Sequence, residues 1–167
     1  MRHLGLDPGM TATGWGIIDA ERGWLGHVAN GAIAPPSGLD TAARLAFLHD
    51  GLTAVIRRYR PDVAAIEEVF VARNPASAIK LGMARGVVMA AAAAAGLSIA
   101  EYAARAVKKA VVGVGGADKA QVQAMVRRVL PGVALNGPDA ADALAVAICH
   151  AGESATRRRW AVAEARP

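Results

Sequence analysis

Four acidic residues stand where a carboxylate is unusual or where two lie close together. Asp7 ends a short apolar stretch and is followed at once by a Pro-Gly pair. Glu67 lies inside an apolar segment, and Asp139 and Asp142 are three residues apart. A carboxylate in apolar surroundings must be paired, bind a metal ion or reach solvent, so these four residues are the candidates for chemistry.

Each acid also has a structural interpretation when it is considered alone. Asp7 before Pro-Gly is typical of a turn residue whose side chain caps the local backbone. Asp139 and Asp142 fit the first turn of a helix, where negative charge is favourable. Glu67 is harder to explain in this way. Its neighbour Glu68 points to the opposite face of a strand and is the better candidate for a solvent-exposed residue.

The four acids can also act together. If the strands that end at Asp7 and Glu67 are parallel and adjacent, both carboxylates lie at one edge of the sheet, where α/β proteins bind ligands. Asp139 and Asp142 share a face of one helical turn and can join them. Like charges brought together raise one another's pKa values, and a hard divalent cation removes that repulsion.

Oxygen ligands of this kind suit Mg²⁺, and Mn²⁺ accepts them as well. Two such ions about 4 Å apart activate water and stabilise the leaving oxygen in phosphoryl displacement. We therefore expect a magnesium site. The four histidines are scattered along the chain and do not have the spacing of a zinc site.

Hydrophobic periodicity and capping residues predict the elements that position these acids. The expected strands end at Asp7 and cover residues 13–20, 23–34, 62–70 and 97–104. The expected helices cover residues 40–61, 74–96 and 118–132 and a last one opens at Pro138. Short gaps make the first three strands antiparallel. The predicted fold class is α/β, a mixed five-stranded sheet of three antiparallel strands followed by two parallel ones, flanked by helices.

Composition limits the class of protein. The chain has 167 residues, of which 54% are hydrophobic and 4% aromatic, which fits one domain with a packed core. Its single cysteine, Cys149, excludes an internal disulfide and fits a reducing compartment. The N-terminus lacks a signal-peptide pattern, so we expect a cytoplasmic location. We expect the folded domain to cover residues 1–152 and residues 153–167 to form a basic, flexible tail.

One uncharged segment, residues 86–100, raises the question of a membrane span. It is shorter than the about 20 apolar residues that a span requires, and alanine dominates it. We therefore expect a core helix that ends at Gly96 and no contact with a membrane. On this helix Gly82, Gly86 and Ala90 recur every four residues, so another helix of this chain or of a second subunit can approach closely.

Net charge is +5, from 19 Lys and Arg against 14 Asp and Glu. This modest excess suits a polyanionic partner, although a soluble protein can carry it without one.

Segments spread along the whole body of the chain resemble the RuvC family of bacterial Holliday junction resolvases. They are LGLDPG, TGWG, AIEEVF, RNPASAIKLGMARG, EYAARAVKKAVVGVGGADKAQVQAMV and DAADALAVAI, and they cover residues 4–148. Actin-like and sugar-kinase-like ATPases share the opening segment in outline. Those proteins need two such domains, and this chain has no Walker-type glycine loop. An ATPase of this kind and a non-catalytic junction-binding module are the alternatives.

The resemblance implies a ribonuclease H-like fold, a homodimer and a Mg²⁺-dependent endonuclease that nicks opposing strands of four-way DNA junctions. It implies two ions per active site, 5′-phosphate and 3′-hydroxyl ends, and partnership with the RuvA and RuvB branch-migration proteins. It matches Asp7, Glu67, Asp139 and Asp142 to the metal-binding catalytic acids of the family.

The resemblance also matches five residues to DNA-binding positions: Phe70, Arg73, Lys80, Lys108 and Lys119. The ring of Phe70 would stack on an unpaired base. Lys108 and Lys119 would contact phosphate or stabilise its developing charge. Arg73 and Lys80 would contact backbone phosphates, although a solvated helix end explains Lys80 equally well.

Overall fold

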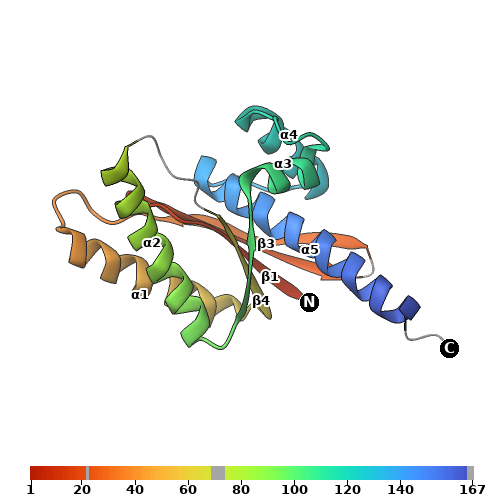
Figure 1. Cartoon of the computed structure of the whole chain (residues 1–167), viewed down its shortest axis with the longest axis horizontal. Coiled ribbons are helices and arrows are strands. Elements are labelled where there is room, and N and C mark those ends of the chain that lie inside the picture. The colour runs from red at the N-terminus through yellow and green to blue at the C-terminus, as the bar shows by residue number, and fades with distance from the viewer. Residues whose placement is uncertain (22, 69–73, 165–167) are drawn as a thin grey trace.

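A five-stranded mixed sheet forms the centre of the structure, a computed structural model that describes residues 1–21, 23–68 and 74–164 (Figure 1). The strands are β1 (Arg2–Asp7), β2 (Thr13–Glu21), β3 (Trp24–Ile33), β4 (Val63–Glu67) and β5 (Ser98–Tyr102). The sheet order is β3-β2-β1-β4-β5. β1 pairs antiparallel with β2, and β2 with β3, whereas β4 lies parallel to β1 and to β5. The predicted sheet is therefore confirmed.

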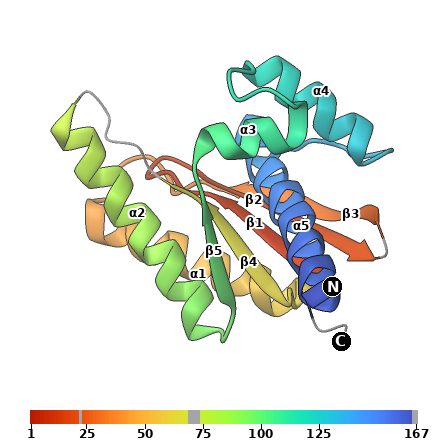
Figure 2. The ribbon, with the colours of Figure 1, turned by 45° about the vertical axis from the view of Figure 1, so that its right-hand side comes forward.

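Helices cover both faces of this sheet. They are α1 (Thr41–Tyr59), α2 (Pro75–Ala94), α3 (Ala104–Val112), α4 (Lys119–Val129) and α5 (Pro138–Glu164). α1 and α2 pack on one face, and α5 with α3 and α4 covers the other (Figure 2). α3 was not predicted, because its short apolar pattern is interrupted by a pair of lysines.

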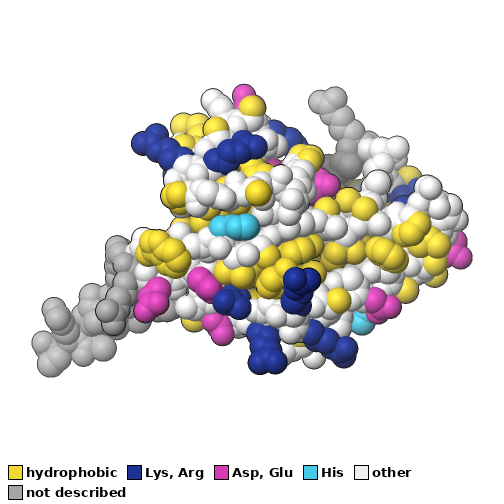
Figure 3. Space-filling view, turned by 180° about the vertical axis from the view of Figure 1, so that it is seen from behind, with side chains coloured by type: hydrophobic (Ala, Val, Ile, Leu, Met, Phe, Trp, Pro, Cys, Tyr) yellow, Lys and Arg dark blue, Asp and Glu magenta, His cyan; other side chains and the backbone are white. Residues whose placement is uncertain are grey.

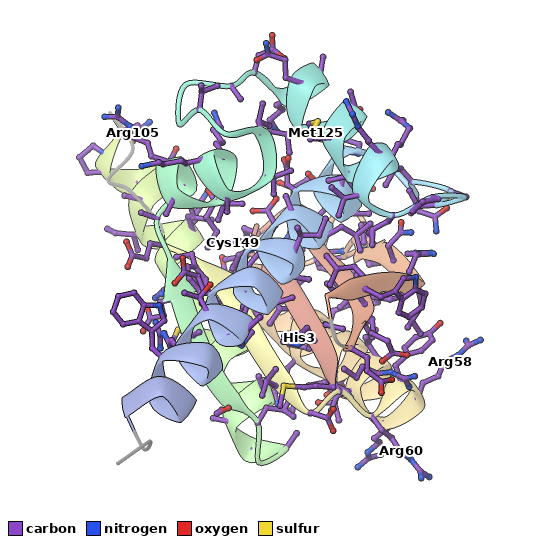
Figure 4. All side chains as sticks on the ribbon, turned by 90° about the vertical axis from the view of Figure 1, so that its right-hand side faces the viewer. His3, Arg58, Arg60, Arg105, Met125 and Cys149 are labelled. Carbon is purple, nitrogen blue, oxygen red and sulfur yellow. The ribbon has the colours of Figure 1, made fainter. Side chains whose placement is uncertain are left out.

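Strand alternation divides the core between the two faces. Leu4 and Leu6 of β1 are fully buried in the cluster that includes α1 and α2. Gly5 lies between them and faces α5, which crosses the sheet in front of His3 on β1 (Figure 4). In β2, Ile17 and Ile18 divide in the same way between the two clusters. Neighbouring residues of these strands thus point to opposite faces of the sheet, and both faces are buried.

Local capping chemistry sets the start of three helices, and the sequence predicts two of these caps, Asp40 and Asn74. Asp40 accepts a hydrogen bond from the Ala43 backbone N–H (2.8 Å) at the start of α1. Asn74 caps α2 in the same way, with Pro75 as the first helical residue. At α4, Asp118 and Gln121 form a reciprocal capping box. These side chains satisfy backbone N–H groups that have no partner within the helix.

α2 is not the core helix that we expected. Only one side of it is buried, through Ala84, Val88, Ala91 and Ala92, against α1 and the sheet. In the described part of the chain it is the one helix long and apolar enough to cross a membrane, and only 22% of that window is buried inside the structure. Length and composition alone are a weak indication, because helices of globular domains pass the same test. Its apolar character needs another explanation.

α5 runs from Pro138 to Glu164 without ending at residue 152, where the sequence analysis placed the boundary of the folded domain. The first half of the helix packs on β1 and β2 and is buried. The division into a domain of residues 1–152 and a tail of residues 153–167 stays a prediction.

Glycines let α5 lie directly on the sheet. A Cβ atom on Gly5 would stand 2.0 Å from the carbonyl oxygen of Ala143 and 2.6 Å from the backbone nitrogen of Ala147. A Cβ atom on Gly14 would stand 2.0 Å from the carbonyl oxygen of Asp139. Both neighbours are backbone atoms, so a side chain at either position would move the helix.

We predict that Gly5→Ala lowers the free energy of unfolding by about 3 kcal/mol, because overpacking against backbone cannot be relieved by a rotamer change. Urea denaturation measures this change. The matched control is Gly152→Ala in α5, where a Cβ atom meets nothing within 4 Å. It should raise the stability by about 0.5–1 kcal/mol through helix propensity. Equal effects of the two substitutions would contradict the packing argument.

Candidate active site

Asp7 and Glu67 lie side by side at one edge of the sheet. They end the parallel neighbours β1 and β4, in which Leu6 is paired with Ile66. Gly5 and Ala65, two residues earlier, face the α5 side of the sheet. Because side chains alternate along a strand, both carboxylates point to that side as well.

The first turn of α5 meets them there. Gly14 on β2 is paired with Asp7, and the backbone of Asp139 packs directly against Gly14. Asp139 and Asp142 therefore begin α5 directly beside the end of β1. Three elements that are far apart in the sequence thus bring the four predicted acids together.

The electrostatics of the acids report this closeness. Burial, followed by the negative charges of Glu67, Asp142 and Asp139, raises the pKa of Asp7 from 3.8 to about 7. Burial and the charge of Asp142 also raise the pKa of Glu67. Both raised pKa values mean that it costs free energy to keep Asp7 and Glu67 ionised in the folded chain.

Two lysines partly compensate this charge. Lys119, the first residue of α4, donates a hydrogen bond from Nζ to Oδ2 of Asp142 at 3.0 Å, and this bond raises the pKa of Lys119. Lys108 on α3 lies close enough to oppose the upward pKa shift of Glu67. The structure therefore brings Lys108 and Lys119 to the acids, as the sequence analysis expected.

Within residues 1–21, 23–68 and 74–164, no group of three or more His, Cys, Asp or Glu side chains is arranged to hold a metal ion. The donor set itself suits a hard cation, because it consists of carboxylate oxygens and the neighbouring negative charges raise the pKa values of Asp7 and Glu67.

The other predicted site residues are distributed as follows. Phe70 and Arg73 lie outside the described residues. Lys80 on α2 is exposed and lines a cavity next to the turn that follows Asp7. Glu68 is exposed, as predicted, and its backbone N–H bonds to the Tyr102 carbonyl at 2.8 Å.

Sequence reasoning missed the residues that hold the turn after Asp7. The buried Thr13 hydroxyl donates to the carbonyl oxygen of Gly9 (3.0 Å) and accepts from its N–H (3.3 Å). These two bonds close the turn from Gly9 to Thr13. The TGWG segment contains this threonine, but nothing in the sequence shows which group its hydroxyl bonds.

A pair of asparagines positions the segment that leads into α5. The buried Asn30 of β3 donates to the carbonyl oxygen of Ala134 (2.9 Å) and accepts from the N–H of Asn136 (2.8 Å). The Asn136 side chain donates in turn to the Asn30 carbonyl (2.9 Å). These bonds join residues more than 100 positions apart and hold the start of α5 against the sheet.

Comparison with known proteins identifies the family. The model of the family "Crossover junction endodeoxyribonuclease RuvC" matches residues 3–150. The chain belongs to the RuvC family. The RuvC protein of Rhodospirillum rubrum is 59% identical over 151 residues, which cover 90% of this chain and 89% of that protein. The RuvC protein of Paramagnetospirillum magneticum is 56% identical over 166 residues, 99% of this chain and 100% of that one.

The RuvC fold is also similar in three dimensions. The structure "T. thermophilus RuvC in complex with Holliday junction substrate" matches with a TM-score of 0.86 and 32% identity, over 93% of this chain and 96% of that one. The ribonuclease H-like fold that the resemblance implied is therefore confirmed. A match over nearly the full length also disfavours the ATPase alternative.

The raised pKa of Asp7 predicts a pH-dependent cost in stability. Between its ordinary pKa of 3.8 and about 7, the folded chain binds more protons at Asp7 than the unfolded chain does, so stability falls as the pH rises. At about 1.4 kcal/mol per pKa unit, this loss is at most about 4 kcal/mol by pH 8. Asp7→Asn should remove it.

Urea denaturation in EDTA measures this prediction. The Asp7→Asn variant should be more stable than the unchanged chain at about pH 8 and equally stable at about pH 4. Glu68→Gln is the control, because its carboxylate is exposed to solvent. An equal gain at both pH values, or an equal gain in the control, would contradict the assignment to Asp7.

Proposed function

We propose that this protein resolves Holliday junctions by nicking opposing strands, as a structure-selective endodeoxyribonuclease of recombination and DNA repair. The observation that carries the proposal is the convergence of four carboxylates from β1, β4 and α5 on one edge of the sheet. Membership in the RuvC family supports the junction as substrate, since a RuvC protein of this fold is known in complex with one.

We infer that Asp7, Glu67, Asp139 and Asp142 hold divalent cations, two per site, with Mg²⁺ as the ion and Mn²⁺ as a substitute. The family of nucleases supports a divalent metal in general, and the all-oxygen donor set favours these two ions. The bound cations would supply positive charge that activates water and stabilises the leaving oxygen.

The protein's own residues bind and orient the DNA strand in this proposal. Lys119 and Lys108 lie beside the acids and would attract the scissile phosphate and stabilise the charge that develops on it. Lys and Arg side chains also lie over α4, at the top of the face in Figure 3. We keep Phe70 and Arg73 as DNA contacts on the strength of the family resemblance alone.

A homodimer would present two such sites to the two symmetric strands of a junction. The small-residue face of α2 supports this proposal, because Gly82 and Gly86 are exposed and a Cβ atom on either meets nothing within 4 Å. No helix among the described residues occupies that face, so a second copy of the chain is the partner that we propose. We also propose RuvA and RuvB as partners and the cytoplasm as the location, on the strength of the family resemblance.

The central experiment incubates the protein with an end-labelled four-way junction, in Mg²⁺ or in EDTA. We expect symmetric nicks on opposing strands in Mg²⁺ alone, which a ligase seals. ATP hydrolysis without nicking would support the ATPase alternative, and binding without nicking would support the non-catalytic module.

Carboxylate variants test the site. Asp7→Asn and Glu67→Gln should each slow nicking by about a hundredfold or more, as for loss of one stabilising group in a catalytic site. Junction binding should persist or tighten, because a negative charge near the phosphate is removed. Glu68→Gln is the matched control and should nick at the unchanged rate. If Glu68→Gln slowed nicking as much as Glu67→Gln does, the assignment of Glu67 rather than Glu68 to the site would be wrong.

A bulky polar side chain on α2 tests the dimer. Gly86→Gln should shift the protein towards monomer in size-exclusion chromatography with light scattering, because it fills the surface that a second helix would contact. Gly152→Gln, on an equally open helical position of α5, should leave the oligomeric state unchanged. Unchanged dimers in both variants would exclude this face of α2 from the interface.

A further inference from the structure

A cavity of about 440 Å³ lies beside the turn that follows Asp7. Its lining combines the turn with the start of α1 and with α2: Met10, Thr11, Asp40, Thr41, Arg44 and Lys80. The sequence analysis singled out only the lysine. The cavity thus joins two basic side chains from different helices to the turn that follows Asp7.

Arg44 is held in place at this cavity. Its side chain is partly buried, and Nε donates a hydrogen bond to the carbonyl oxygen of Leu39 at 3.0 Å. This bond fixes the planar guanidinium group. Among the described residues, no acceptor bonds its two terminal nitrogens, so they are available to a ligand. A fixed arginine fork is well suited to phosphate oxygens.

The start of α1 adds to this arrangement. The backbone N–H groups of the first turn of this 19-residue helix favour an anion, and the hydroxyl groups of Thr11 and Thr41 can donate as well. Asp40 also lines the cavity, and its carboxylate bonds to the Ala43 N–H as the helix cap. Two positive side chains against one negative side chain leave the cavity with a net positive charge.

We propose that this cavity binds a backbone phosphate of the junction strand, separate from the phosphate that is cut. The proposal rests on the proposed junction-nicking function. From Asp7 to Thr11 the backbone spans at most about 14 Å. Phosphates follow one another every ~3.4 Å of helix axis along a strand, so the cavity can hold one that lies a few nucleotides from the cut. Arg44 and Lys80 are the phosphate ligands, and the site would fix the strand on the sheet edge.

Arg57 provides the matched control. It lies in the last turn of the same helix and is exposed. That end of α1 is marked by Arg58 and Arg60 in Figure 4, and it is the end opposite to the cavity. Arg57→Gln therefore changes the net charge of the protein by the same amount as Arg44→Gln at a site outside the cavity.

The test measures binding of a fluorescent four-way junction in EDTA over a range of salt concentrations. Arg44→Gln and Lys80→Gln should each weaken binding by about tenfold at low salt, the effect of losing a charge-assisted hydrogen bond. Each should also reduce the slope of log affinity against log salt concentration by about 1. Arg57→Gln should change neither quantity appreciably.

A second measurement locates the phosphate. Junctions are prepared with a single neutral methylphosphonate linkage at successive positions on either side of the cut. One linkage should weaken binding by the unchanged protein and have no further effect on the Arg44→Gln variant. That pattern shows that the arginine and that phosphate act on each other.

Several outcomes would overturn the inference. It would be contradicted if Arg44→Gln had the same affinity and salt slope as Arg57→Gln. It would also be contradicted if every methylphosphonate linkage that weakens binding by the unchanged protein weakened binding by the Arg44→Gln variant as well. Lys80 is exposed and makes no bond to Leu39, so Lys80→Gln remains informative if Arg44→Gln fails to fold. If the unchanged protein neither binds nor nicks junctions, the proposed function fails. If it does both while the variants match the control, only this inference fails.

Discussion

The close packing of α5 against the glycines of β1 and β2 is the contact on which the rest of the structure depends. Gly5 and Gly14 bring the helix backbone onto the sheet, and Gly16 accommodates the Leu144 side chain in the same layer. A helix held at the usual distance by larger side chains would carry Asp139 and Asp142 away from the ends of β1 and β4. Displacements of about 1 Å are enough to impair a catalytic site.

This packing brings like charges together, and the fold bears the electrostatic cost. The raised pKa values of Asp7 and Glu67 measure that cost, and the ion pair of Lys119 with Asp142 reduces it in part. Carboxylates arranged in this way destabilise the folded chain, and the cations that we propose for the site would relieve the repulsion between them. The site therefore gives up stability for function, as is common where charges are held close to one another.

Two surface regions outside the four acids are suited to binding other molecules. The exposed, small-residue face of α2 lies on one side of the sheet, and the cavity with Arg44 lies between the start of α1 and the turn after Asp7. One suits a second helix, because two backbones can approach closely there, and the other suits a phosphate. In our proposals, the first contacts a second copy of the chain and the second contacts the DNA strand next to the four acids.

The sequence by itself determined the order of the strands and of every helix except α3, the helix caps at Asp40 and Asn74, and the four acids as candidates for the site. Such features depend on neighbours along the chain, and periodicity and capping residues report those neighbours directly. Only the tertiary structure decided that the four acids meet, that α2 is exposed on its small-residue face and that α5 continues to Glu164. The bonds between Asn30 and Asn136 and the cavity around Arg44 also depend on residues that are far apart in the chain. No local pattern encodes such contacts, because they form only when packing brings separate elements together.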